Sequence, residues 1–182
     1  MSEGAAVLLA DGFEEIEAIT VIDVLRRAGV AVSLVGVTGR QVTGRSKITV
    51  AAELGIVEAL SREWDAVIVP GGAQGAERLR DDDGVRRLLL AQDAAHRLIG
   101  AICAGPIALG AVGVLDGRRA ACYPGFEAQM AEASATSDAV VVDHHVVTSR
   151  GPGTAMAFAL TLAELLAGAA TASEVRKRML VE

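Results

Sequence analysis

Aromatic residues are scarce in this chain: Phe, Tyr and Trp make up 3% of its 182 residues, although 52% are hydrophobic. Its core must therefore be built mainly from Ala, Val, Leu and Ile. No apolar run approaches the roughly 20 residues that a membrane span requires. A formal charge of −6 leaves no basic excess for contacts with phosphates, which argues against a nucleic-acid partner. We expect one domain, residues 1–182, that binds neither membrane nor nucleic acid.

Cysteine is equally scarce, with Cys103 and Cys122 as the only two thiols. The N-terminal residues show no secretory signal and run directly into an apolar segment. These features predict a cytoplasmic protein with both thiols reduced. Cys122 either lines a pocket with Cys103 or packs in a sheet, and the sequence favours packing.

Short apolar runs alternate with amphipathic segments, which is typical of an α/β fold. We expect strands at Ala5–Ala10, Val30–Val37, Asp65–Pro70, Leu98–Ile102, Arg119–Cys122, Ala139–Val142 and Val146–Ser149, and a hairpin at Gln41–Ala52. Helices are expected at Glu14–Ala28, Asp81–Arg97, Pro106–Leu115, Phe126–Ala133, Gly153–Leu166 and Ser173–Leu180. Because the strands show little alternation, they predict a mainly parallel sheet covered by helices on both faces.

The stretch LIGAICAGPIAL places Cys103 at an abrupt corner between a strand and a helix. Small neighbours allow a sharp bend, and Pro106 suits a first helical turn. This is the pattern of a nucleophile elbow with Cys in place of Ser. The positive end of the following helix is expected to lower the thiol pKa from about 8.5 towards roughly 3.5–7.5. The alternative is a buried cysteine that packs as a small hydrophobic residue.

Three loops should meet near Cys103, because ligands of such sheets bind beyond the carboxyl ends of the strands. One loop begins at Asp11, the second contains Gly71 and Gly72, and the third is the elbow. Gly71 and Gly72 are consistent with a simple tight turn. They also allow a backbone amide there to form an oxyanion hole with the amide of Ala104.

Acidic residues open the first expected helix, as in many helices. Glu14 and Glu17 lie three residues apart on one face. A carboxyl group held near Cys103 in an apolar site would have a raised pKa and could pass protons to and from the sulfur.

Two further clusters are interpreted as structural. Asp81, Asp82 and Asp83 are expected to cap a helix rather than to bind a metal. His144 and His145 are expected to form an exposed hairpin turn, since no third or fourth metal ligand is evident. We therefore expect neither a metal nor another cofactor.

Five segments in register resemble the ThiJ/PfpI superfamily, in the branch of the Parkinson's-disease-associated deglycase and redox sensor. They are DGFEEIEA (Asp11–Ala18), DVLRRAG (Asp23–Gly29), VIVPGG (Val67–Gly72), AICAGP (Ala101–Pro106) and TSRGPGT (Thr148–Thr154). The resemblance implies a flavodoxin-like sandwich and a homodimer. It also implies that Cys103 is a nucleophile and an oxidation-sensitive thiol, with Glu17 as its protonated partner.

The resemblance further implies a glyoxalase that needs no glutathione, or a deglycase that acts on early glycation adducts. Members are also described as chaperones or as sensors in the oxidative stress response. The alternative function is thus a sensor in which Cys103 is oxidised to a sulfinate beside Glu17, without dedicated turnover.

The chain departs from the family pattern at the position of a frequent histidine, which is Tyr123 here. A phenol with a pKa near 10 is no base at neutral pH, so a peptidase is not expected. The family also supplies an arginine across the dimer. We carry that role over to Arg27 and not to Arg45, where the match slips by one residue.

Overall fold

A central sheet of seven strands organises the chain in the computed structural model, which describes residues 4–181. Its strand order is β10-β11-β7-β6-β1-β2-β5. The bounds are Ala5–Leu9 (β1), Val32–Gly36 (β2), Leu54–Gly55 (β5), Ala66–Val69 (β6), Leu98–Ile102 (β7), Val140–Asp143 (β10) and Val146–Ser149 (β11). Only the pairing of β10 with β11 is antiparallel within this sheet. The predicted, mainly parallel sheet is confirmed.

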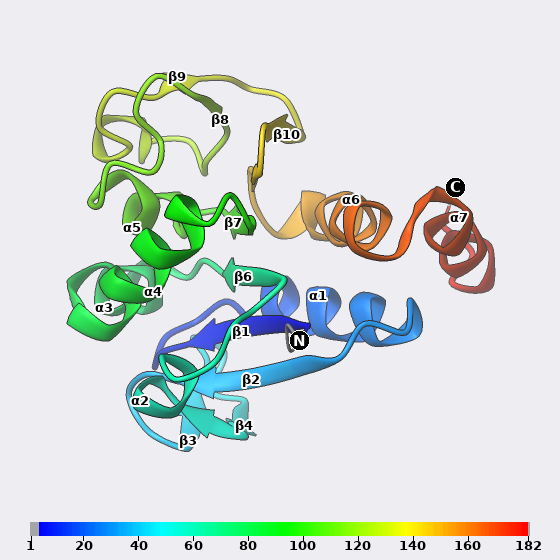
Figure 1. Cartoon of the computed structure of the whole chain (residues 1–182), viewed down its shortest axis with the longest axis horizontal. Coiled ribbons are helices and arrows are strands. Elements are labelled where there is room, and N and C mark those ends of the chain that lie inside the picture. Colours follow the sequence, from blue (N-terminus) through cyan, green and yellow to red (C-terminus); the bar gives the residue numbers. More distant parts are fainter. Residues whose placement is uncertain (1–3, 182) are drawn as a thin grey trace.

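Helices cover both faces of the sheet (Figure 1). One layer comprises Glu15–Arg27 (α1), Ala155–Ala167 (α6) and Ala169–Arg178 (α7), and the other comprises Ile56–Ala59 (α2), Ala73–Asp81 (α3), Asp83–Ala94 (α4) and Pro106–Gly110 (α5). Successive side chains of β1 point to opposite faces of the sheet, so this strand contributes to the hydrophobic core on each face. Ala5, Val7 and Leu9 pack towards α1 and α6, while Ala6 and Leu8 pack towards α3 and α4. The flavodoxin-like α/β sandwich is therefore confirmed.

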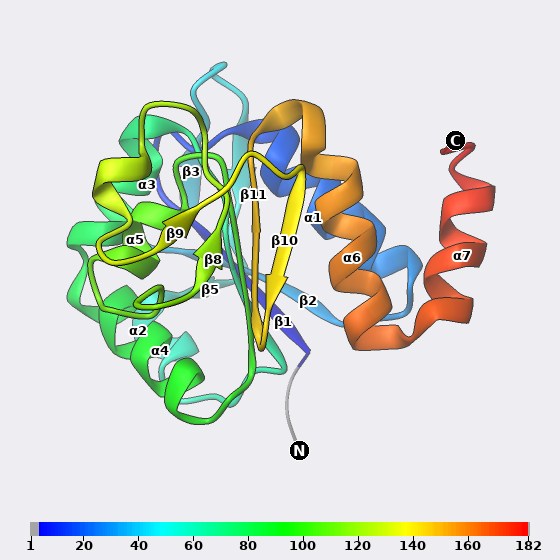
Figure 2. The ribbon, with the colours of Figure 1, turned by 90° about the horizontal axis from the view of Figure 1, so that it is seen from above.

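Two small ribbons lie outside the main sheet. Gln41–Thr43 (β3) and Thr49–Ala51 (β4) form the predicted antiparallel hairpin, and their connecting loop projects at one end of the sheet (Figure 2). Arg119–Ala120 (β8) and Ser134–Ala135 (β9) pair in parallel. Pro152–Thr154 forms a short 3-10 turn before α6.

Several helices differ from the sequence-based expectation, among them α7, which begins at Ala169 rather than at Ser173. Asp81 ends α3, which was not predicted, and Asp82 caps α4 by accepting a hydrogen bond from the Val85 amide. The helix after Cys103 ends at Gly110 rather than near Leu115, because the chain turns through Gly113 at a φ of 76°. The helix expected at Phe126–Ala133 is a single 3-10 turn at Glu127–Gln129.

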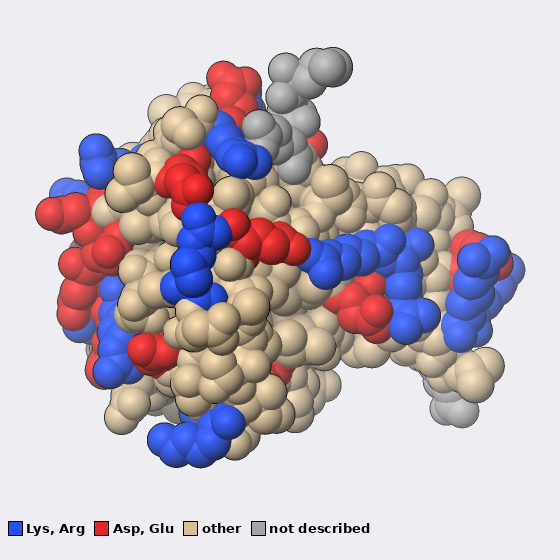
Figure 3. Space-filling model, turned by 90° about the horizontal axis from the view of Figure 1, so that it is seen from below, with Lys and Arg blue, Asp and Glu red and all other residues tan. Residues whose placement is uncertain are grey.

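Two further features concern the distribution of charge on the surface and the lengths of the helices. On the face shown in Figure 3, acidic and basic side chains are interspersed rather than gathered by sign. No helix within residues 4–181 is long and apolar enough to cross a membrane.

Candidate active site

Cys103 lies directly after β7, where the carboxyl ends of β1, β6 and β7 meet. Its φ of 63° is a left-handed conformation that few non-glycine residues adopt. Two backbone hydrogen bonds hold this turn: the Cys103 amide donates to the Ser149 carbonyl at 2.9 Å, and the Tyr123 amide donates to the Cys103 carbonyl at 2.9 Å. The elbow therefore has a strained backbone at Cys103, and it places a largely buried thiol at the expected edge of the sheet.

Glu17 approaches this thiol from the first turn of α1. Its side chain is fully buried, and its Oε2 accepts a hydrogen bond from the Gly71 amide at 2.8 Å. Its Oε1 is buried without a partner inside the described chain. A Cβ added at Gly71 would lie 2.5 Å from both Cys103 Cβ and Glu17 Oε2. The missing side chain of Gly71 therefore lets the carboxyl group and the thiol approach each other.

Burial sets the protonation of this pair. It raises the pKa of Glu17 to about 7, chiefly by removing water from the carboxylate. Burial also raises the pKa of the Cys103 thiol, and the negative charge of an ionised Glu17 raises it further. A proton on Glu17 removes that charge. A state with negative charge on both the carboxyl group and the sulfur is therefore disfavoured.

The expectation of a lowered thiol pKa is thus wrong for the thiol taken alone. The helix after Cys103 is only a single turn long, so its dipole is small, and desolvation outweighs it. Two backbone amides act in the opposite direction. Those of Gly72 and Ala104 form hydrogen bonds to the sulfur and lower its pKa. In the resting site, the two amides predicted for an oxyanion hole thus face the sulfur.

Glu14 lies beside this centre as the N-cap of α1. Its amide donates to the Gly71 carbonyl at 2.9 Å, and its Oε2 accepts a hydrogen bond from Arg45 Nη1 at 2.9 Å. The charge of Arg45 lowers the pKa of Glu17, and Arg45 also interacts electrostatically with Cys103. Arg45 was given no role from the sequence, because the match to the family slips by one residue there. The turn of the β3–β4 hairpin brings it to the site, where its amide donates to the Phe13 carbonyl at 2.9 Å.

Tyr123 borders the opposite side of the thiol. A Cβ at Gly151 would lie 3.2 Å from the Tyr123 ring and 4.0 Å from Cys103 Sγ. Tyr123 is 47% exposed, so its ring lies at the rim of the site.

Arg27 is not brought to this centre: it pairs with Asp23 near the far end of α1, about 15 Å along the axis from Glu17. Cys122 packs in the core on the α3–α5 face.

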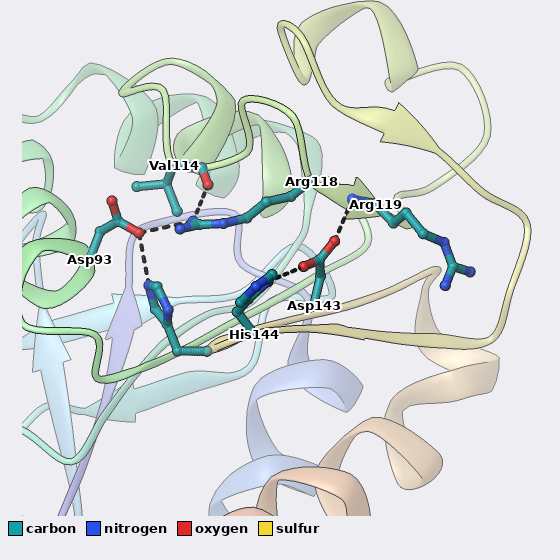
Figure 4. A network of polar contacts seen from close by, with 7 residues as sticks. Asp93, Val114, Arg118, Arg119, Asp143 and His144 are labelled. Atoms are coloured by element: carbon teal, nitrogen blue, oxygen red, sulfur yellow. Dashed lines mark hydrogen bonds and ion pairs between the residues drawn. The ribbon is translucent and has the colours of Figure 1, made fainter.

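The histidines form a separate polar network (Figure 4). His145 Nε2 and Arg118 Nη1 both contact Asp93 Oδ1, at 2.8 and 2.9 Å, and His144 pairs with Asp143. The side chain of His145 is only 11% exposed, so the expectation of a fully exposed turn holds for His144 alone. The network ties the β10–β11 turn to α4. Across residues 4–181, no three His, Cys, Asp or Glu side chains are arranged to hold a metal ion.

Comparison with known proteins gives one family over most of the chain. The model of the DJ-1/PfpI family matches residues 3–165. Protein dj-1beta of Drosophila melanogaster is 39% identical over 184 residues, covering 100% of this chain and 98% of that protein. The crystal structure of Drosophila DJ-1beta has a TM-score of 0.94 at 38% identity and covers 100% of both chains.

Two further similarities concern chemistry. A Caenorhabditis elegans protein named glutathione-independent glyoxalase DJR-1.2 is 35% identical over 169 residues, covering 91% of this chain and 90% of that protein. A structure described as oxidized DJ-1 of Toxoplasma gondii has a TM-score of 0.93 at 36% identity and covers 97% of each chain.

Proposed function

The chain belongs to the DJ-1/PfpI family, and on that premise we propose that it is a cysteine-dependent, cofactor-free glyoxalase. Its substrates are α-oxoaldehydes such as methylglyoxal and glyoxal, and their early glycation adducts are the related substrates of a deglycase. The observation that carries the proposal is the contact between Cys103 and a buried Glu17 whose pKa is raised to about 7. The worm relative named a glyoxalase supports the choice of reaction.

The first step joins sulfur to the aldehyde carbon. Glu17 holds the proton that leaves the thiol, the carbon–sulfur bond forms, and the carbonyl π electrons move to oxygen. The amides of Gly72 and Ala104 donate hydrogen bonds to this developing oxyanion. Glu17 then returns a proton to the oxygen, which gives a neutral hemithioacetal.

The second step moves hydrogen within the substrate. The Glu17 carboxylate removes the proton from the former aldehyde carbon, and the neighbouring keto carbon is reprotonated. The aldehyde carbon is thereby oxidised to a thioester while the ketone is reduced to an alcohol, so no external oxidant is needed. Water hydrolyses the thioester to a 2-hydroxy acid and regenerates the thiol. With a hemiaminal adduct, sulfur forms its bond to the same carbon while the carbon–nitrogen bond breaks. The amine leaves with the proton that Glu17 took from the thiol, which gives the same hemithioacetal.

Lactate formation from methylglyoxal without glutathione tests this proposal. We expect Cys103→Ser to lower the rate at least a hundredfold, because the alcohol is a far poorer nucleophile at neutral pH. Cys122→Ser is the matched control and should retain activity, because that thiol packs in the core. Absence of lactate above background with the wild-type protein overturns the assignment.

A redox sensor is the second candidate, and the same pocket supports it. A sulfinate at Cys103 would accept hydrogen bonds from the amides of Gly72 and Ala104 and from a protonated Glu17. A selective gain of two oxygens at Cys103 under peroxide, in a protein that forms no lactate, favours this candidate.

We also propose a homodimer. Ile16, Ile19 and Ile48 are exposed apolar side chains, at 54, 42 and 56%. Ile16 and Ile19 lie three residues apart on α1, and the Ile48 amide donates to Glu15 Oε1 at 3.4 Å, so we propose that these side chains contribute to the dimer surface. Light scattering of the purified protein tests the dimer.

A further inference from the structure

A groove of about 590 Å³ lies beside the catalytic thiol. It is bounded by the loop after β1, the β3–β4 hairpin and the beginning of α3, which meet at one end of the sheet (Figure 2). Its lining residues are Asp11, Gly12, Thr43, Gly44, Arg45, Lys47, Ala73, Gln74 and Arg78. The volume falls within the range of small-molecule sites.

The groove shares its wall with the thiol pocket. Gly72, whose amide contacts the sulfur of Cys103, directly precedes Ala73 in the groove lining. A Cβ at Gly72 would lie 2.2 Å from the Gly12 carbonyl oxygen, so the two loops touch at this point. Arg45 spans both regions, because it lines the groove and acts electrostatically on Cys103. The groove and the thiol pocket are therefore neighbours on the two sides of the contact between Gly12 and Gly72.

The groove is cationic although the chain is acidic overall. Three of its lining residues, Arg45, Lys47 and Arg78, are basic, and Asp11 is the single acidic one. Arg45 is matched by Glu14. Within residues 4–181, Lys47 and Arg78 form no ion pair, and Arg78 donates only to the Asp11 backbone carbonyl. With Glu14 and Asp11 counted against the three basic residues, the groove keeps an excess of one positive charge in a protein of net charge −6.

Local contacts position the two segments that carry Lys47 and Arg78. Lys47 has a φ of 69°, and its amide donates to the Gly44 carbonyl at 3.0 Å, which closes the hairpin turn. Arg78 is held from α3 by its bond to the loop after β1. The first turn of α3 adds backbone N–H groups, since no side chain caps that helix. Cations and amides of this kind favour an anionic group.

We propose that this groove binds a phosphate or carboxylate group of the carbonyl substrate, so that the preferred substrates are α-oxoaldehydes with an anionic tail. The inference rests on the proposed glyoxalase function and adds a substrate class to it. The aldehyde carbon lies at Cys103 and the tail at Lys47 and Arg78. Neutral methylglyoxal fills only the thiol pocket.

The test compares methylglyoxal with hydroxypyruvaldehyde phosphate and with dioxovalerate, which carry a phosphate and a carboxylate. We expect the wild-type protein to show a higher kcat/KM for one or both anionic compounds, mainly through a lower KM. In Lys47→Gln/Arg78→Gln, the ratio of anionic to neutral kcat/KM should fall by on the order of tenfold, since two exposed cations are lost. Added salt should narrow the difference in the wild-type protein. Arg87→Gln, an exposed change on α4, is the control.

A second readout does not require turnover. Inorganic phosphate should slow alkylation of Cys103 by iodoacetamide in the wild-type protein and should do so less in the double variant. Equal kcat/KM ratios and equal protection in both proteins overturn the groove assignment while lactate formation from methylglyoxal still upholds the function. Loss of lactate formation with phosphate protection retained overturns the function instead.

Discussion

Gly71→Ala should lower the rate of lactate formation from methylglyoxal by at least a hundredfold. The added methyl group would lie 2.5 Å from both Cys103 Cβ and Glu17 Oε2, and 3.0 Å from the Ala104 amide nitrogen. No carbon atom is tolerated at such distances, so the thiol and the carboxyl group must separate. Displacements of about 1 Å in a catalytic centre cost on the order of a hundredfold in rate.

The matched control is Gly153→Ala, because a Cβ at Gly153 meets no atom within 4 Å. Initial rates and the circular dichroism spectrum of both variants separate damage to the site from damage to the fold. If folded Gly71→Ala retains the wild-type rate, close contact between Cys103 and Glu17 is not required for catalysis.

Glu17→Gln should stabilise the protein at pH 8 by up to about 3 kcal/mol, because a pKa displacement from 4.5 to about 7 has that value. The folded state of the wild-type protein prefers a protonated Glu17. The contribution of Glu17 to the free energy of unfolding is therefore fully present below the unfolded pKa of 4.5, and it is lost as the pH rises to about 7. The amide does not titrate. The difference in the free energy of unfolding between Glu17→Gln and the wild-type protein should therefore grow from pH 4.5 to about pH 7 and stay constant at higher pH.

Urea unfolding of both proteins at pH 4.5 and at pH 8 measures this effect. The same variant should form lactate much more slowly, since an amide carries no proton between substrate carbons. A stability difference that is equal at the two pH values would show that Glu17 is not held protonated by burial.

Much of the site was predictable because it depends on local patterns. The apolar run before Cys103 and the small residues after it specify the elbow, and the parallel sheet brings Gly71 and Gly72 to the same edge. The elbow and the shared edge require only the strand ends and the helical period, both of which the sequence carries. The spacing of Glu14 and Glu17 places both at the start of α1, and the choice of Glu17 as the partner of the thiol came from the family resemblance.

The remaining features depend on long-range packing. Arg45 reaches the site through the β3–β4 hairpin, whose register no local pattern in Gln41–Ala52 specifies. The raised pKa of the buried thiol follows from desolvation, which is known only once the site is closed. The α3 helix was missed because Gly75 interrupts its pattern; that glycine packs against Phe13 and leaves no room for a side chain.

Acid quenching during methylglyoxal turnover, followed by mass analysis of the peptide that contains Cys103, is the most direct test of the central claim. The account predicts one methylglyoxal equivalent on Cys103, released by hydroxylamine as a thioester in the wild-type protein. In Glu17→Gln this hydroxylamine-labile adduct should be absent, because the hemithioacetal cannot rearrange to a thioester and reverts to the free thiol and methylglyoxal. Lactate production with Cys103 unmodified throughout would contradict the account.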